Sequence, residues 1–156
     1  TIETTFNSTY DVYQLVISGM TIQSATTMIA ELKIGGAYIT SSYGYFGMQL
    51  NSSTATYTAY VGEAGAGIYL TGTDPATTSG DSLDLIINIY NPSSTAFKKL
   101  INWQGTSTMA GNAQRVMLLN GTAVNSNTGA LTGIRFYMGS GNIVAGKFRL
   151  YGLSNS

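Results

Sequence analysis

Short runs of alternating apolar and polar residues fill most of this chain, and turn residues separate the runs. Because successive side chains of a strand point to opposite faces, this alternation predicts strands with one buried face. Turn signals every 8–12 residues are typical of a β-sandwich or a β-barrel. The predicted strands are Val12–Ser18, Met28–Ile34, Ala37–Phe46, Thr56–Val61, Gly67–Thr71, Leu83–Tyr90, Phe97–Gln104, Gln114–Leu119, Gly133–Met138 and Lys147–Gly152.

Turn residues fill the gaps between these runs, among them Gly35-Gly36, Asn91-Pro92 and Asn120-Gly121. Only Ala25–Leu32 is a candidate for two helical turns, and its two threonines disfavour them. Nothing in the composition divides the 156 residues, and their number is near the usual size of one domain. We therefore predict a single all-β domain over residues 1–156.

The closing segment shows the alternation most clearly. Ile134–Met138 and Lys147–Tyr151 each alternate large apolar side chains with polar or charged ones. Turn chemistry between them predicts that the chain ends in a β-hairpin. The residues of that expected turn are Gly139, Gly141, Asn142 and Gly146.

Charge is unusually scarce. Charged residues make up 9% of the chain, against about 25% in typical domains, and the net charge is zero. Nucleic-acid binding needs a basic stripe to neutralise phosphates, whereas Lys98-Lys99 is the only adjacent basic pair. On a strand its two members point to opposite faces. We expect neither nucleic acid nor an anionic membrane as a partner.

Cysteine is absent, so disulfides and thiolate metal sites are excluded. No apolar run reaches the roughly 18 residues of a membrane helix. The first residues carry neither the basic nor the apolar region of a secretory signal. We therefore expect a protein that is made in the host cytoplasm and acts after assembly or lysis.

The chain also contains no histidine, which removes the commonest general base and zinc ligand and the serine–histidine triad. A pair of carboxylates, as in glycosidases, is the remaining catalytic option. Glu31 and Asp84 alternate with apolar residues, as solvated outer-face residues do, and Asp11 is typical of a turn. We expect no enzymatic activity.

Two loops resemble ligand sites only superficially. Asp74, Asp81 and Asp84 surround one polar loop, but they lack the regular spacing of a calcium loop and serve equally well as turn residues. The glycine-rich stretch 62–67 precedes a strand and contains no lysine, so it predicts a hairpin loop and not a phosphate-binding loop. No metal and no cofactor are expected.

Aromatic residues offer the clearest candidates for binding. Tyr43 and Tyr45 share one face of the predicted strand, beside Ser41, Ser42 and Gly44. Exposed in a loop, these rings are candidates for contact with a glycan or with a neighbouring subunit. The alternative is that they form cross-strand pairs in a sheet. Trp103 is predicted to anchor the core.

Three stretches resemble, in the same order, blocks of small β-sandwich domains in structural proteins of tailed bacteriophages, especially those of marine and freshwater hosts. The first is Ser8–Gly19 and the last is Ser140–Leu153. The middle one, Leu85–Thr95, ends in Tyr-Asn-Pro-Ser-Ser-Thr and is followed by residues 98–105. These blocks are strands and loops, so the resemblance implies a virion location and a jelly-roll-like sandwich, and it transfers no site residues. The about ten strands of this single antiparallel sandwich come from the alternation of the sequence.

The resemblance implies a non-enzymatic virion subunit: a capsid decoration or cement protein, or a tail or fibre component. Its partners would be other virion proteins and copies of itself, with a homotrimer as the expected closed assembly. The alternative is a lectin-like fibre-tip module that recognises a host surface glycan. Arg135, Lys147 and Arg149 are either inter-subunit charge contacts or simply the solvated face of two strands.

Overall fold

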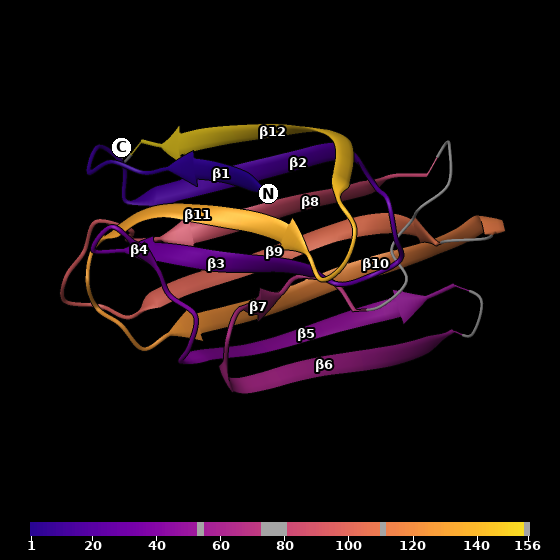
Figure 1. Cartoon of the computed structure of the whole chain (residues 1–156), viewed down its shortest axis with the longest axis horizontal. Coiled ribbons are helices and arrows are strands. Elements are labelled where there is room, and N and C mark those ends of the chain that lie inside the picture. Colours follow the sequence, from indigo (N-terminus) through magenta and orange to yellow (C-terminus); the bar gives the residue numbers. More distant parts are fainter. Residues whose placement is uncertain (53–54, 73–80, 110–111, 155–156) are drawn as a thin grey trace.

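Two antiparallel sheets pack face to face in the computed structural model, which describes residues 1–52, 55–72, 81–109 and 112–154 (Figure 1). Twelve strands and no helix form among these residues. The β-sandwich predicted from the sequence is therefore confirmed. The chain changes sheet repeatedly as it runs from β1 to β12, so strands distant in the sequence become neighbours.

The smaller sheet has five strands, in the order β1-β11-β3-β4. The fifth strand of this sheet, β7, lies outside that order and pairs with β3 at Ile29 and Ala30, whereas β4 pairs with β3 at Lys33 and Ile34. The bounds are β1 Ile2–Thr5, β3 Met28–Ile34, β4 Ala37–Tyr38, β7 Ile68–Tyr69 and β11 Leu131–Met138.

The larger sheet has seven strands, in the order β12-β2-β8-β9-β10-β5-β6. Every neighbouring pair is antiparallel. The bounds are β2 Val12–Ile22, β5 Tyr43–Asn51, β6 Thr56–Gly65, β8 Leu83–Tyr90, β9 Lys99–Met109, β10 Asn112–Asn125 and β12 Ile143–Leu153.

One apolar core lies between the sheets, and the period-two pattern of the strands supplies it. In β8, every second residue from Leu83 to Ile89 is buried and the residues between are half-buried. Complete burial of one such side chain contributes about 1.5–3 kcal/mol. Trp103 is 2% exposed and confirms its predicted place in the core. Other core members are Leu15, Ile17, Met28, Leu32, Tyr43, Ile68, Leu70, Ile101, Leu119, Ile134 and Phe136.

The two closing strands do not form the predicted hairpin. β11 lies in the smaller sheet between β1 and β3, and β12 forms an edge of the larger sheet beside β2. The connection between them crosses from sheet to sheet next to the β2–β3 connection. Backbone bonds join the two crossings, from Gly139 N–H to Thr27 O (2.9 Å) and from Gln23 N–H to Asn142 O (2.9 Å). Alternation predicts the face of each strand but not its partner.

Strand boundaries also differ from the sequence prediction, most clearly at three places. Ala37–Phe46 is divided into β4 and β5, and Ser42 just before β5 has a φ of 64°. Asn120-Gly121, an expected turn, lies inside β10, where Asn120 pairs with Gln104 and Met48. The predicted Gln114–Leu119 strand is thus longer, and β1 was not predicted. Its alternating burial over four residues is too short a signal to separate from a loop.

Aromatic rings occupy the space that glycines leave on neighbouring strands. Trp103 is paired with Gly121, and a methyl group on that glycine would overlap with the indole ring. Tyr60 covers Gly47 in the same way. Because interiors are close-packed, these positions have no room for an added side chain.

A methyl group added beneath Trp103 is therefore expected to destabilise the sandwich. Gly121→Ala should lower the free energy of unfolding by about 1–3 kcal/mol, as overpacking does. The control is Gly44→Ala, whose added carbon would meet only Val124 Cγ1, at 3.5 Å, and should change stability by less than about 0.5 kcal/mol. Urea denaturation followed by Trp fluorescence measures both; equal values for the two variants would contradict the packing argument.

Candidate interaction surface

The seven-stranded sheet turns one face away from the core, and the cross-strand register brings distant residues together on it. Gln14 pairs with Asn88, and Asn88 pairs with Asn102. Side-chain hydrogen bonds link them: Gln14 Nε2 donates to Asn88 Oδ1 (3.0 Å), and Asn88 Nδ2 donates to Asn102 Oδ1 (3.0 Å). Asn102 Nδ2 then donates to the hydroxyl of Tyr90 (3.0 Å). We call these four residues the amide ladder.

Apolar side chains flank the amide ladder on the same face. Leu100 is 52% exposed and Leu118 is 53% exposed, and Phe46 on β5 is 45% exposed. With the half-buried Val16 and Ile86, these five residues are the outer patch. Exposed large apolar groups gathered on one face typically mark an interaction site.

The centre of this outer face carries no charge among the described side chains of β9, β10 and β5. Asp84 lies on β8 of the same face, and both its oxygens accept hydrogen bonds: Oδ1 from Gly19 N–H (2.7 Å) and Oδ2 from Ser82 Oγ–H (2.9 Å). The uncharged outward residues are Leu100, Asn102, Gln104, Thr106, Leu118, Asn120, Thr122, Val124, Gly44, Phe46, Met48 and Leu50.

Two shallow grooves lie beside residues of the outer patch. The larger, about 380 Å³, lies between Val16, Ile86 and Leu118, with Asp84 at its side. The smaller, about 260 Å³, lies between Phe46 and Leu100 above Gly44. Both are open and lined mostly by apolar groups, so they suit protruding side chains of a partner more than a small polar ligand.

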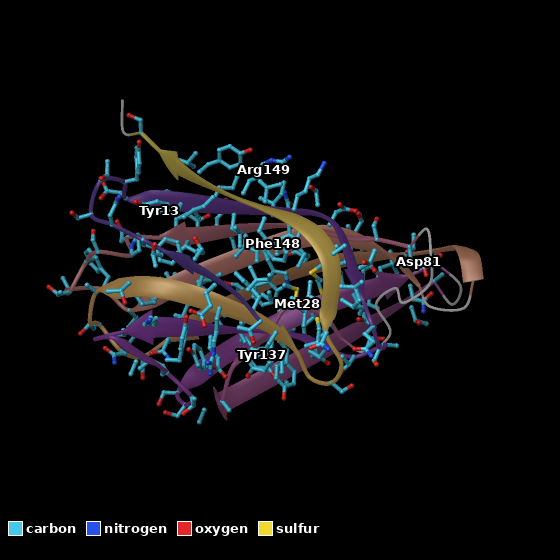
Figure 2. All side chains as sticks on the ribbon, turned by 45° about the horizontal axis from the view of Figure 1, so that its top comes forward. Tyr13, Met28, Asp81, Tyr137, Phe148 and Arg149 are labelled. Carbon is cyan, nitrogen blue, oxygen red and sulfur yellow. The ribbon has the colours of Figure 1, made fainter. Side chains whose placement is uncertain are left out.

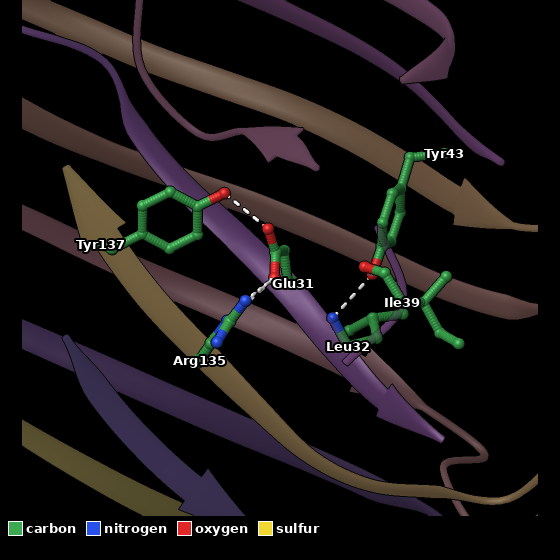
Figure 3. A network of polar contacts seen from close by, with 6 residues as sticks. All are labelled: Glu31, Leu32, Ile39, Tyr43, Arg135 and Tyr137. Atoms are coloured by element: carbon green, nitrogen blue, oxygen red, sulfur yellow. Dashed lines mark hydrogen bonds and ion pairs between the residues drawn. The ribbon is translucent and has the colours of Figure 1, made fainter. Parts of the chain in front are cut away.

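Tyr43 is one of the two predicted contact residues, and the prediction that it is exposed is wrong. Its side chain is completely buried, and its hydroxyl accepts the Leu32 N–H (2.7 Å) and donates to Ile39 O (3.0 Å) (Figure 3). The hydroxyl thus bridges the backbone of β3 to Ile39, the residue that follows β4. Tyr45 lies on the same side of β5, half-buried and stacked on Tyr69 with ring centroids 5.3 Å apart. Its role as a contact residue stays a prediction.

Glu31 corrects another expectation, because it is 3% exposed instead of solvated. Arg135 donates to Glu31 Oε2 from Nε (2.8 Å) and Nη2 (2.6 Å), and the Tyr137 hydroxyl donates to Oε1 (2.5 Å) (Figure 3). The guanidinium carbon also lies 4.1 Å from the ring centroid of Tyr38. Burial, reinforced by Glu31, raises the pKa of the Tyr137 hydroxyl, so this ring remains a donor.

Arg135 is consequently held within its own chain, whereas the other two predicted charge contacts are exposed. Lys147 and Arg149 lie on β12, at the edge of the outer face. Figure 2 shows Arg149 pointing away from the molecule and Phe148 pointing between the sheets. Arg149 Nη1 makes a long bond, 3.4 Å, to Ser18 Oγ. An inter-subunit role for these two residues stays a prediction.

In the described part of the chain, no three or more His, Cys, Asp or Glu residues gather into a group that could hold a metal ion. Asp74 of the predicted polar loop lies outside the described residues. Nor do the described residues contain a helix that could span a membrane.

The sequence prediction did not single out the amide ladder or the outer patch. The available signal was the set of residues between the apolar positions of each strand, such as Gln14, Asn88 and Asn102. That signal becomes a surface only when the register of β2, β8 and β9 is known.

Comparisons with known proteins leave the family of this chain open. No protein-family model matches it, and no curated protein matches its sequence. Among solved structures, the complex of toad ovary galectin with thio-digalactose is similar at 9% identity, over 86% of this chain and 96% of that chain, with a TM-score of 0.28. A likeness this weak carries no argument about function.

Removing the partner of the buried carboxylate is expected to destabilise the smaller sheet. Arg135→Met leaves Glu31 charged without its ion pair, which costs about 3 kcal/mol when one partner of a buried pair is removed. Lys147→Met, at an exposed position, should change stability by less than about 0.5 kcal/mol. Urea denaturation at neutral pH compares the two variants. A small effect of Arg135→Met would show that Glu31 finds compensation elsewhere.

Strong alkali is expected to unfold the protein through its buried tyrosines. Burial raises the pKa of Tyr43 and that of Tyr60 to about 12, from about 10 in an unfolded chain. Both hydroxyls are protonated in both states below pH 10, so their contribution is complete there. Between pH 10 and pH 12 the unfolded chain loses these protons first, and the free energy of unfolding falls by roughly 2 kcal/mol per ring. Denaturation from pH 8 to 12 tests this decline, which should be smaller in Tyr43→Phe.

Proposed function

We propose that this chain is a non-enzymatic structural subunit of a bacteriophage virion, either a capsid decoration or cement protein or a tail- or fibre-associated subunit. The outer patch carries the proposal, because it is an uncharged, partly apolar face built on a rigid sheet. The resemblance of three blocks of the sequence to phage structural domains supports the virion as the proposed setting.

The outer face has the dimensions of a specific protein interface. Seven strands about 4.8 Å apart and roughly 27 Å long give a face of about 800 Å². Standard interfaces bury about 800 Å² on each partner. In the proposed contact, Leu100 and Leu118 pack into the neighbouring protein, and the amide ladder supplies donors and acceptors around them. Fixed hydrogen bonds within the ladder hold its side chains in place, which lowers the entropy lost on docking.

A host surface glycan is the second candidate partner, and the amide ladder is the observation that favours it. Amide groups held in fixed directions beside Tyr90 offer the hydrogen bonds and ring face that a sugar uses. The sugar would then bind on the outer face and not at Tyr43, because Tyr43 is buried.

Incorporation into particles tests the structural role. Mass spectrometry of purified virions should detect the chain, with hundreds of copies for a shell protein and a few dozen or fewer for a tail or fibre. Leu118→Lys, which places a charge in the outer patch, should reduce incorporation at least about tenfold, because an unpaired charge would be buried. Val144→Lys is the control, since this exposed residue of β12 lies outside the patch.

Salt dependence and binding to host polysaccharide distinguish a protein partner from a glycan partner. Docking through uncharged groups should change little between 0.05 and 0.5 M salt. Absence of the chain from particles would contradict the structural role. If host polysaccharide binds the purified protein and Asn102→Ala abolishes that binding, the glycan role is supported instead.

A further inference from the structure

The two edges of the seven-stranded sheet differ in their protection against pairing with another strand. An edge strand presents unpaired backbone N–H and C=O groups, and natural proteins block it with charge, bulges or short length. β12 has such devices: exposed Lys147 and Arg149, and register shifts on both sides of Ala145. Edge strands of the smaller sheet are short, with four residues in β1 and two in β4.

β6, at the other edge of the larger sheet, lacks these devices over Thr56–Gly62. Its register against β5 is regular from Asn51–Thr56 to Tyr45–Gly62, without a bulge. This segment contains no proline and no charged residue, and all of its residues are exposed except Tyr60 and Gly62, which are half-buried. Long, regular and uncharged, the segment is a template for another strand.

The sequence of this segment is complementary to itself. We propose that β6 pairs antiparallel with β6 of a second copy about a two-fold axis at Ala59. In that register Tyr57, 69% exposed, lies opposite Val61 of the second copy, 67% exposed, and the same pair forms again across the axis. Aromatic and β-branched residues are a favourable cross-strand pair.

Orientation and charge agree with this register. A two-fold axis perpendicular to the sheet keeps the outer face of both copies on the same side. Residues of the same face, such as Tyr57 and Val61, are then directly opposite each other only if the axis passes through a residue and not through a peptide bond. Glu63 lies opposite Ala55, so the two carboxylates do not meet. Pairing of β12 with itself would instead bring lysine and arginine side chains of two copies together.

The pairing joins two seven-stranded sheets into one continuous sheet and sets two outer patches side by side on it. It forms a closed, isologous dimer, which needs no other protein and which differs from the homotrimer expected from the resemblance. The inference goes beyond the proposed virion role and does not depend on it, since the purified chain alone should show the dimer.

Light scattering and a single cysteine test the proposal. The wild-type protein should elute at twice the 16.5 kDa of one chain at high concentration. The chain has no cysteine, so Ala59→Cys introduces the only thiol. Directly opposite residues in antiparallel strands have Cα atoms about 4.5–5.5 Å apart, within the range that a disulfide spans. Ala59→Cys should therefore form a disulfide-linked dimer in air, whereas Thr122→Cys, exposed on β10 of the outer face, should not.

Charge variants test the same register without a covalent bond. Ala59→Lys should weaken association about fivefold, because like charges opposite each other destabilise a strand pair. A mixture of Ala59→Lys with Ala59→Glu should restore the dimer, which also shows that both variants fold. A monomeric or trimeric wild type would overturn the proposal. So would a disulfide at residue 122 instead of residue 59, or a dimer that Ala59→Lys leaves intact.

Discussion

Burial of one apolar face of each sheet against the other is the constraint on which the rest of this structure depends. The chain contains few charges and no disulfide, so this contact supplies most of its stability. It also fixes details that look unrelated to it. Trp103 fits because Gly121 opposite it has no side chain, and Tyr43 brings its hydroxyl through the core to the β3–β4 pairing. Because one residue in two points into the core, the alternate residues of the seven strands form a second, outer surface.

The two outer faces of the sandwich are chemically different. On the smaller sheet, charge is gathered and neutralised: Glu31 is held by Arg135 and Tyr137, and Tyr38 stacks on the guanidinium. On the larger sheet, amides bond to one another, and leucines and a phenylalanine remain exposed between them. An ion pair whose hydrogen bonds are satisfied within its own chain has little left to offer a partner. The uncharged face keeps its apolar area available, which is why the proposed contacts are assigned to it.

The two proposed contacts use different parts of the larger sheet, its outer face and its edge strand β6. As proposed, they are compatible, because the outer patch would contact a different protein through side chains while β6 would pair with a second copy through backbone groups. A joined sheet would present its two patches at a fixed spacing, so a partner with repeated sites would be bound by both at once. Symmetric shells and fibres have such repeated sites.

The sequence by itself determined the fold class, the single core and the face of most strands, because period-two alternation and turn residues are local signals. Leu83–Tyr90 was predicted with its observed bounds, and Trp103 with its observed burial. The tertiary structure alone decided which strands are neighbours. It placed β11 and β12 in different sheets, buried Glu31 beside Arg135, and assembled the amide ladder from three strands. These outcomes depend on register and on crossings between sheets, which are set by long-range packing and leave no local pattern in the chain.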